Sequence, residues 1–182
     1  MMSSIQELKD FQLPDGFRGK PGWFVQLWWI VQSTLFAFSP QFMYGWRRWL
    51  LRLFGADIGK KVIIRPTARI TYPWKVKVGN YSWIGDDVVI YSLGEVYIGD
   101  NVVISQRSYL CTGSHDYNSR NFDIFSKPIV VKDKAWLATD VFVAPGLTIG
   151  RGAVVGARSS VFSDLPEMTI CVGYPAKPVK QR

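Results

Sequence analysis

Aliphatic residues recur at every sixth position over most of the chain, and this spacing constrains the fold more than any other feature. The series consists of Ile58, Ile64, Ile70, Val78, Ile84, Ile90, Ile98, Ile104, Leu110, Val131, Leu137, Val143, Ile149, Val155 and Val161. A helix repeats every 3.6 residues and a strand every two, so a sustained period of six predicts neither a helical bundle nor an ordinary sheet. It is typical of a solenoid built from short repeats.

Each six-residue unit is interpreted as one short strand and a turn, with one aliphatic side chain pointing inward. Three units close a triangular coil, and successive coils stack as parallel strands about 4.8 Å apart. No unit buries its own apolar face, so stability must come from stacking. Glycine often follows the aliphatic residue, as at Gly59, Gly79 and Gly99, and we expect it there for the turn dihedrals. The prediction is an all-β fold, a parallel β-helix of about five coils.

The chain divides near residue 55 into parts of unequal character. Residues 1–56 form a polar arm followed by an aromatic-rich segment, residues 57–168 carry the repeat, and residues 169–182 form a C-terminal tail. The largest break in the repeat follows the single histidine, His115. Residues 116–130 are therefore predicted to loop out of the prism.

Residues 23–54 are rich in Trp, Phe and Tyr and are predicted to form two helices joined at Pro40. The charge-free part, residues 23–38, is shorter than the roughly 20 residues that span a bilayer. Two interpretations stay open. One is an apolar cap on the repeat or a contact between chains. The other is peripheral membrane contact, in which anionic lipid attracts the basic side chains Arg47, Arg48 and Arg52.

The composition of the chain limits which kinds of ligand and partner it can be expected to bind. A net charge of +8 over 182 residues predicts an anionic partner. Nucleic acid is not expected, because the basic residues do not cluster with stacking aromatics on the repeats. One histidine and two cysteines exclude a disulfide framework and most zinc designs, so no metal site is expected. No cleavage site follows the apolar run, which favours a cytoplasmic protein, either free or at the inner membrane face.

These features resemble the hexapeptide-repeat acyltransferases, whose fold is a left-handed parallel β-helix. The similarity covers about residues 58–180 and is strongest to sugar O-acetyltransferases of the colanic-acid and exopolysaccharide branch. It rests on the repeat, on the leader at residues 45–59, on CTGSHDY at residues 111–117 and on AWL at residues 135–137. The resemblance implies acetyl-CoA as acyl donor, a homotrimer and a sugar hydroxyl as acceptor. Whether the acceptor is lipid-linked stays open.

Acyl transfer to a hydroxyl needs a base, and histidine is the side chain suited to that role near neutral pH. The resemblance assigns it to His115, which we place at a repeat corner. Asp116 is adjacent, but its side chain should point away along a strand. Cys111 offers a rival acyl-enzyme route, yet four residues along a strand separate it from the imidazole. Direct transfer in a ternary complex is therefore expected.

The resemblance also implies donor contacts in a groove between two subunits. Trp136 matches an aromatic residue at the thiol end, and Thr139 and Ala157 match positions along the pantetheine arm. Lys177 and Lys180 match basic positions near the adenosine 3′-phosphate, where a lysine acts as a point charge.

The sequence departs from the family pattern in the last coil and at the acceptor site. Phe162 and Ser163 replace a Thr-Lys pair, and the usual acidic residue is absent at Ser92 and Leu93. The residues that line the acceptor pocket are therefore named only as candidates. They are Tyr91, Glu95, Gln106, Arg107 and Asp116.

Two other functions stay open. An amine acceptor on an amino-sugar nucleotide would make the chain an N-acetyltransferase. A non-enzymatic β-helix scaffold would bind no coenzyme A and would be indifferent to a change at His115. A carbonic anhydrase of the same repeat class needs three zinc-binding histidines, which a single histidine excludes.

Overall fold

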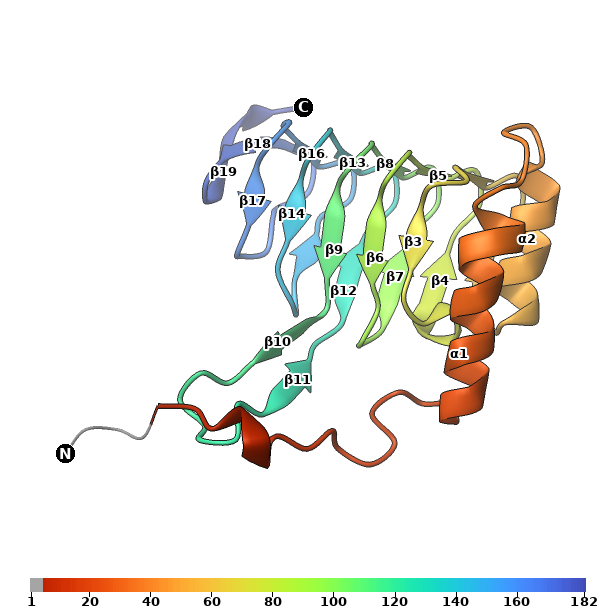
Figure 1. The fold of residues 1–182 in the computed structure, drawn as a ribbon. Coiled ribbons are helices and arrows are strands. Elements are labelled where there is room, and N and C mark those ends of the chain that lie inside the picture. The colour runs from red at the N-terminus through yellow and green to blue at the C-terminus, as the bar shows by residue number, and fades with distance from the viewer. Residues whose placement is uncertain (1–4) are drawn as a thin grey trace.

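The computed structural model describes residues 5–182, and the first four residues of the predicted arm lie outside the described part. The repeat region winds into a triangular prism with three walls of parallel strands (Figure 1). Sheet A contains β1 (Asp57–Ile58), β4 (Val76–Val78), β7 (Val96–Ile98), β12 (Ile129–Val131) and β15 (Thr148–Ile149). Sheet C contains β3 (Arg69–Ile70), β6 (Val89–Tyr91), β9 (Tyr109–Cys111), β14 (Phe142–Val143) and β17 (Ser160–Val161).

Sheet B is the longest wall. Its strands are β2 (Ile63–Ile64), β5 (Trp83–Ile84), β8 (Val103–Ile104), β13 (Trp136–Leu137), β16 (Val154–Val155), β18 (Thr169–Gly173) and β19 (Ala176–Gln181). The described chain thus completes five coils, begins a sixth at β18 and ends with β19 folded back antiparallel. The predicted left-handed β-helix is confirmed.

The aliphatic series fills the interior of the prism. Ile64, Ile84, Ile104, Leu137 and Val155 are in direct register on successive strands of sheet B, and each is at most 1% exposed. Sheets A and C stack their aliphatic residues in the same way. The inward orientation predicted from the period of six is therefore correct.

The role predicted for the corner glycines is wrong. None of Gly59, Gly79 and Gly99 has a left-handed backbone; positive φ falls two residues further on, at Lys61, Tyr81 and Asn101. What these positions require is space for the next coil. A Cβ built on Gly99 would lie 2.7 Å from the backbone nitrogen of Asp133, closer than real Cβ contacts come.

Gly99→Ala should lower the free energy of unfolding by about 1–3 kcal/mol, because the added methyl group overpacks the backbone of the next coil. Gly45→Ala is the matched control, since a Cβ there meets only the end of the Arg48 side chain at 3.8 Å. In a helix that change should raise stability by roughly 0.5–1 kcal/mol. Chemical denaturation measures both. Equal stability of the two variants would contradict the close-approach explanation.

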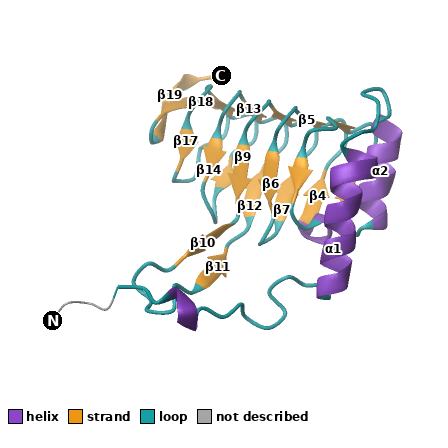
Figure 2. Ribbon diagram, viewed as in Figure 1, coloured by secondary structure: helices purple, strands orange, loops and turns teal. Residues whose placement is uncertain are grey.

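The aromatic segment forms the N-terminal helices and closes one end of the prism (Figure 2). It contains α1 (Gly22–Val31), the π-helical turn η2 (Gln32–Phe36) and α2 (Tyr44–Leu53). Trp28, Phe36, Leu50, Leu51 and Phe54 join the main core from this side. Neither helix within residues 5–182 has the length and apolarity needed to cross a bilayer.

The arginines of α2 cap the first coil, with Arg47 fully buried, Arg48 half-buried and Arg52 exposed. The first coil has no preceding coil, so the carbonyls at its open edge need other donors. Arg47 is fully buried and donates from Nε to the Ile64 carbonyl at 2.6 Å. Arg48 donates to the Val62 carbonyl at 2.9 Å. Arg52 donates from Nε to the Ile58 carbonyl at 3.0 Å, and the Trp28 indole donates to the Ile70 carbonyl of the same edge at 2.7 Å.

Candidate active site

His115 lies on a hairpin that leaves the prism between the third and fourth coils (Figure 1). The hairpin consists of β10 (Gly113–His115) and β11 (Ile124–Ser126), which pair antiparallel with His115 opposite Ile124. The excursion starts at Gly113, earlier than the predicted loop at residue 116. The histidine therefore stands on a projecting strand and not at a coil corner. The third coil is already complete with Leu110 on β9, so His115 does not belong to a further unit of that coil.

The exit of the hairpin is fixed by buried contacts. Thr112 is fully buried, and its hydroxyl donates to the Tyr91 carbonyl at 2.6 Å and accepts from the Gly94 N–H at 2.8 Å. Gly113 has no room for a side chain, because a Cβ there would lie 2.6 Å from Cδ1 of Leu93. The direction in which β10 leaves the prism is thereby set by the coil below it.

A backbone carbonyl orients the imidazole. Nδ1 of His115 is 2.7 Å from the carbonyl oxygen of Phe122. A carbonyl only accepts, so Nδ1 carries the proton and Nε2 of the neutral ring has a free lone pair. The Phe122 ring stacks on the imidazole at 4.2 Å and 9°. Asp116 does not take part, because its Oδ1 accepts from the Asn118 N–H at 2.9 Å in the hairpin turn.

Cys111 is not set up as a nucleophile. Its thiol donates to the Gly113 carbonyl at 3.1 Å. Burial raises the pKa of the Cys111 thiol. Since the thiolate is the reactive form, an acyl-enzyme at this position is disfavoured.

Cys111→Ser should therefore leave kcat for acetyl transfer within about threefold of the parent chain, because no covalent step passes through the thiol. Steady-state rates measured by thiol release from acetyl-CoA, with mass spectrometry of the quenched protein, provide the measurement. A loss of a hundredfold or more together with an acetylated Cys111 in the parent chain would establish the acyl-enzyme route instead.

The outer face of sheet B forms an apolar groove that contains Trp136. The groove has a volume of about 500 Å³ and is lined by outward residues such as Ile63, Trp83, Val103 and Trp136. Trp136 is 45% exposed, and its indole N–H donates to the Ser105 hydroxyl at 3.0 Å. The Trp136 indole therefore offers a flat apolar face whose single polar group is already hydrogen-bonded.

The other predicted donor residues extend this face toward the C-terminal end. Thr139 and Ala157 are stacked at one corner, where the Arg158 N–H donates to the Thr139 carbonyl at 2.9 Å. In the register of sheet B, Trp136 is followed by Val154, Ile170 and then Lys180 on β19. Lys177 lies on the same terminal strand, and both lysines are exposed.

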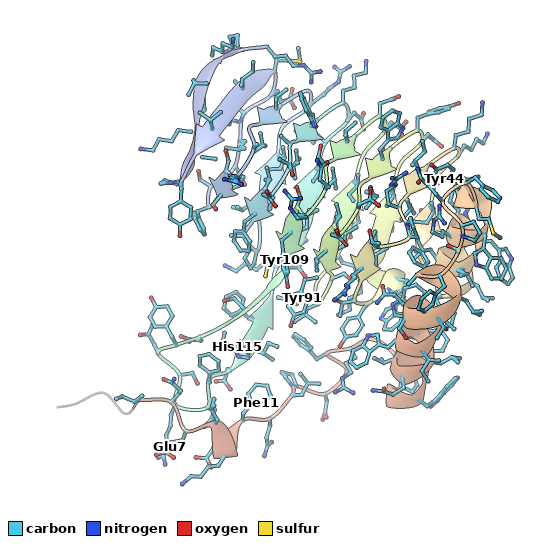
Figure 3. The ribbon with its side chains drawn as sticks, turned by 45° about the horizontal axis from the view of Figure 1, so that its top comes forward. Glu7, Phe11, Tyr44, Tyr91, Tyr109 and His115 are labelled. Atoms are coloured by element: carbon cyan, nitrogen blue, oxygen red, sulfur yellow. The ribbon has the colours of Figure 1, made fainter. Side chains whose placement is uncertain are left out.

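The acceptor candidates are split between two places. Tyr91 is half-buried near the base of the hairpin, and burial raises the pKa of its phenol (Figure 3). Glu95 precedes the same base, where its carbonyl accepts from the Ile129 N–H at 3.0 Å. Gln106 instead lines the sheet B groove, and Arg107 forms an ion pair with Asp140 at 2.7 Å. These side chains do not converge on one pocket within a single chain.

His115 and Trp136 likewise lie on different sides of the molecule. The hairpin projects below the prism in the view of Figure 1, whereas β13 lies along the opposite edge. A site that uses both must be completed by another chain.

Sequence reasoning missed two aromatic neighbours of His115, Phe11 and Phe122. The ring centroid of Phe11 is 5.8 Å from that of the imidazole. Phe11 belongs to the polar arm and Phe122 to the irregular loop, and neither follows a periodic pattern. No signal in the sequence connects either residue with the histidine.

Comparisons with known proteins agree with this architecture, although no family model matches the chain. The chain is 61% identical over 178 residues to an Escherichia coli (strain K12) protein named as the colanic acid biosynthesis acetyltransferase WcaF, with 98% of each chain covered. The structure of a maltose O-acetyltransferase from Clostridium difficile 630 has a TM-score of 0.80 at 27% identity, covering 88% of this chain and 89% of that one. A galactoside acetyltransferase in complex with coenzyme A has a TM-score of 0.82 at 23% identity, covering 93% and 84%, and supports the fold alone.

Stacked hexapeptide coils with a projecting hairpin define this chain as a hexapeptide-repeat acetyltransferase. The similarity at 61% identity extends over nearly the whole chain, helices and arm included. The protein therefore belongs to the colanic acid biosynthesis acetyltransferases, enzymes of exopolysaccharide synthesis.

Proposed function

We propose that the enzyme transfers an acetyl group from acetyl-CoA directly to a sugar hydroxyl, with His115 as general base. The observation that carries this proposal is the bond from Nδ1 of His115 to the Phe122 carbonyl, because it leaves Nε2 as the proton acceptor. A backbone carbonyl in this position also stabilises the imidazolium formed during transfer.

The steps follow from that tautomer. Nε2 removes the hydroxyl proton while the sugar oxygen attacks the thioester carbonyl, which gives a tetrahedral oxyanion. The carbon–sulfur bond then breaks, and the imidazolium returns the proton to the leaving thiolate. The products are the O-acetyl sugar and free coenzyme A, so no group stays on the protein.

The donor site is proposed along the outer face of sheet B. The apolar surface beside Trp136 suits the pantetheine arm, and the column of Thr139 and Ala157 borders it. Lys177 and Lys180 supply positive charge at the far end for the phosphates. The three strand steps from Trp136 to Lys180 correspond to roughly 14 Å, a span that an extended pantetheine arm can follow.

The active form is proposed to be a cyclic trimer. The hairpin with His115 leaves one side of the prism, while the groove with Trp136 occupies another. Packing prisms side by side brings the hairpin of one chain to the groove of the next, and closed heterologous contacts of this kind form rings. The acceptor candidates Tyr91 and Gln106, which are apart in one chain, would then face the same site.

His115→Ala should lower kcat by roughly 10²–10⁴ while leaving the affinity for acetyl-CoA unchanged, because a general base contributes to the rate and not to donor binding. Thiol release and calorimetric titration with acetyl-CoA measure the two effects. Asn118→Ala is the matched control, since Asn118 is exposed on the same hairpin and the change keeps its backbone N–H, which makes the turn bond to Asp116. Full turnover by His115→Ala would exclude the mechanism, and absence of donor binding by the parent chain would favour a scaffold.

The same variant tests the assembly. Trimers refolded from a mixture of His115→Ala and Trp136→Ala chains would contain sites with both residues intact. If the mixture is much more active than the summed activities of the two single variants, the active sites lie between chains. A purely additive result would place each site within one chain.

An acceptor panel with matched amino and hydroxyl sugars separates N- from O-transfer.

Peripheral membrane contact is proposed as a second property. The outer surface of the helical cap exposes apolar side chains that include Trp23, Ile30, Phe38, Phe42, Trp49 and Leu53. Aromatic residues of this kind are favoured at the lipid headgroup level. Such contact would bring the active site to a lipid-linked acceptor. Because Arg47, Arg48 and Arg52 bond to strand carbonyls, apolar burial must supply most of the binding.

The full chain should therefore cosediment with anionic vesicles, and Phe38→Ser combined with Phe42→Ser should reduce the bound fraction severalfold. These two side chains are 85% and 79% exposed, so the changes leave the core intact. Tyr174→Ser is the control, since this side chain is 78% exposed at the opposite end of the prism. Equal binding by the double variant and the control would exclude the helical cap as the contact surface.

A further inference from the structure

The N-terminal arm, residues 5–21, is fastened across the hairpin and does not hang free. At its start the Glu7 N–H donates to the Arg120 carbonyl at 2.8 Å, and Asp10 lies 3.8 Å from the Arg120 guanidinium. At its end the Arg18 carbonyl accepts from the Trp74 indole at 2.7 Å. The arm thus connects the tip of the hairpin to the helical cap, as the course of the chain in Figure 1 shows.

Phe11 brings the arm into contact with the imidazole. Its ring is tilted by 56° against that of His115 at a centroid distance of 5.8 Å (Figure 3). The Phe122 ring stacks on the same imidazole. The short 3-10 helix η1 (Leu8–Asp10) directly precedes Phe11 and sets its direction. Two aromatic rings from different segments therefore restrict the rotation of the histidine side chain.

The hairpin needs such support. It is two-stranded, with three residues on each strand, and lies outside the parallel sheets. An isolated hairpin of this kind is marginally stable in water. Its histidine must nevertheless hold Nε2 in one direction, since displacements of about 1 Å can cost two orders of magnitude in rate.

We propose that Phe11 is a positioning residue for His115, and that the arm serves to hold the general base in its reactive orientation. The inference rests on the proposed role of His115 and adds a second segment of the chain to it. Phe11 belongs to neither of the hydrophobic clusters that stabilise the described fold. Its role is therefore local, and its removal should leave the prism intact.

Phe11→Ala should lower kcat by about tenfold or more, with KM for acetyl-CoA and the melting temperature nearly unchanged. Phe11→Tyr keeps the ring and should restore most of the rate. Leu13→Ala is the matched control, because Leu13 lies on the same arm, is 37% exposed and is two residues from the contact. Thiol release under saturating donor and acceptor gives the rates.

Proton NMR provides a readout that general destabilisation would not reproduce. His115 is the single histidine of the chain, so its ring protons give one assignable set of signals in protein without a polyhistidine tag. Ring currents from Phe11 and Phe122 should displace these signals from the positions of free histidine. Phe11→Ala should move them toward those positions, and Leu13→Ala should not.

The outcomes separate this inference from the proposed mechanism. Full activity of His115→Ala overturns the mechanism itself. An inactive His115→Ala together with a fully active Phe11→Ala overturns only the positioning role. Equal losses in Phe11→Ala and Leu13→Ala also overturn it, because the arm would then act without this contact. Unshifted His115 signals in the parent chain would show that the contact is absent, whatever the variants do.

Discussion

The close stacking of successive coils is the constraint on which the rest of the structure depends. Each strand bonds to the strand one coil away, and its inward aliphatic side chain lies directly on the next one. Corner residues such as Gly99 lack a Cβ because the backbone of the next coil occupies that space. A single coil is therefore not stable alone. At the two ends of the stack, the unpaired backbone groups and the apolar interior must be covered by other parts of the chain.

The N-terminal end shows how the open edge is closed. Carbonyls of the first coil that have no strand partner accept hydrogen bonds from Trp28, Arg47 and Arg52. A fully buried guanidinium is costly unless its donors are satisfied, and Arg47 bonds to four oxygens. The aromatic helices are thus part of the fold itself, and their exposed outer face is what remains for a membrane or another surface.

A regular prism has little room for chemistry, because its inner positions are filled and its corners are packed. The candidate base accordingly lies on a departure from this regularity. The hairpin carries His115 away from the wall, where the rings of Phe122 and Phe11 lie against the imidazole from two segments of the chain. The apolar groove beside Trp136, in contrast, lies on the regular wall of sheet B. The proposed mechanism, which uses both His115 and this groove, therefore requires that chains assemble.

The sequence by itself determined the solenoid, its inward residues, the helical leader, the projecting loop and the histidine as the candidate base. The first four follow from the period of six and the composition of the leader, whereas the assignment of the base to His115 rests on the resemblance to the hexapeptide-repeat acyltransferases. Only the tertiary structure decided why the corner glycines are glycine, what the arginines of α2 bond to, and where the loop leaves the coil. It also brought Phe11 to His115 across 104 positions of sequence separation. Such contacts depend on how distant segments pack against each other in space. No periodic pattern in the sequence of either segment predicts that packing.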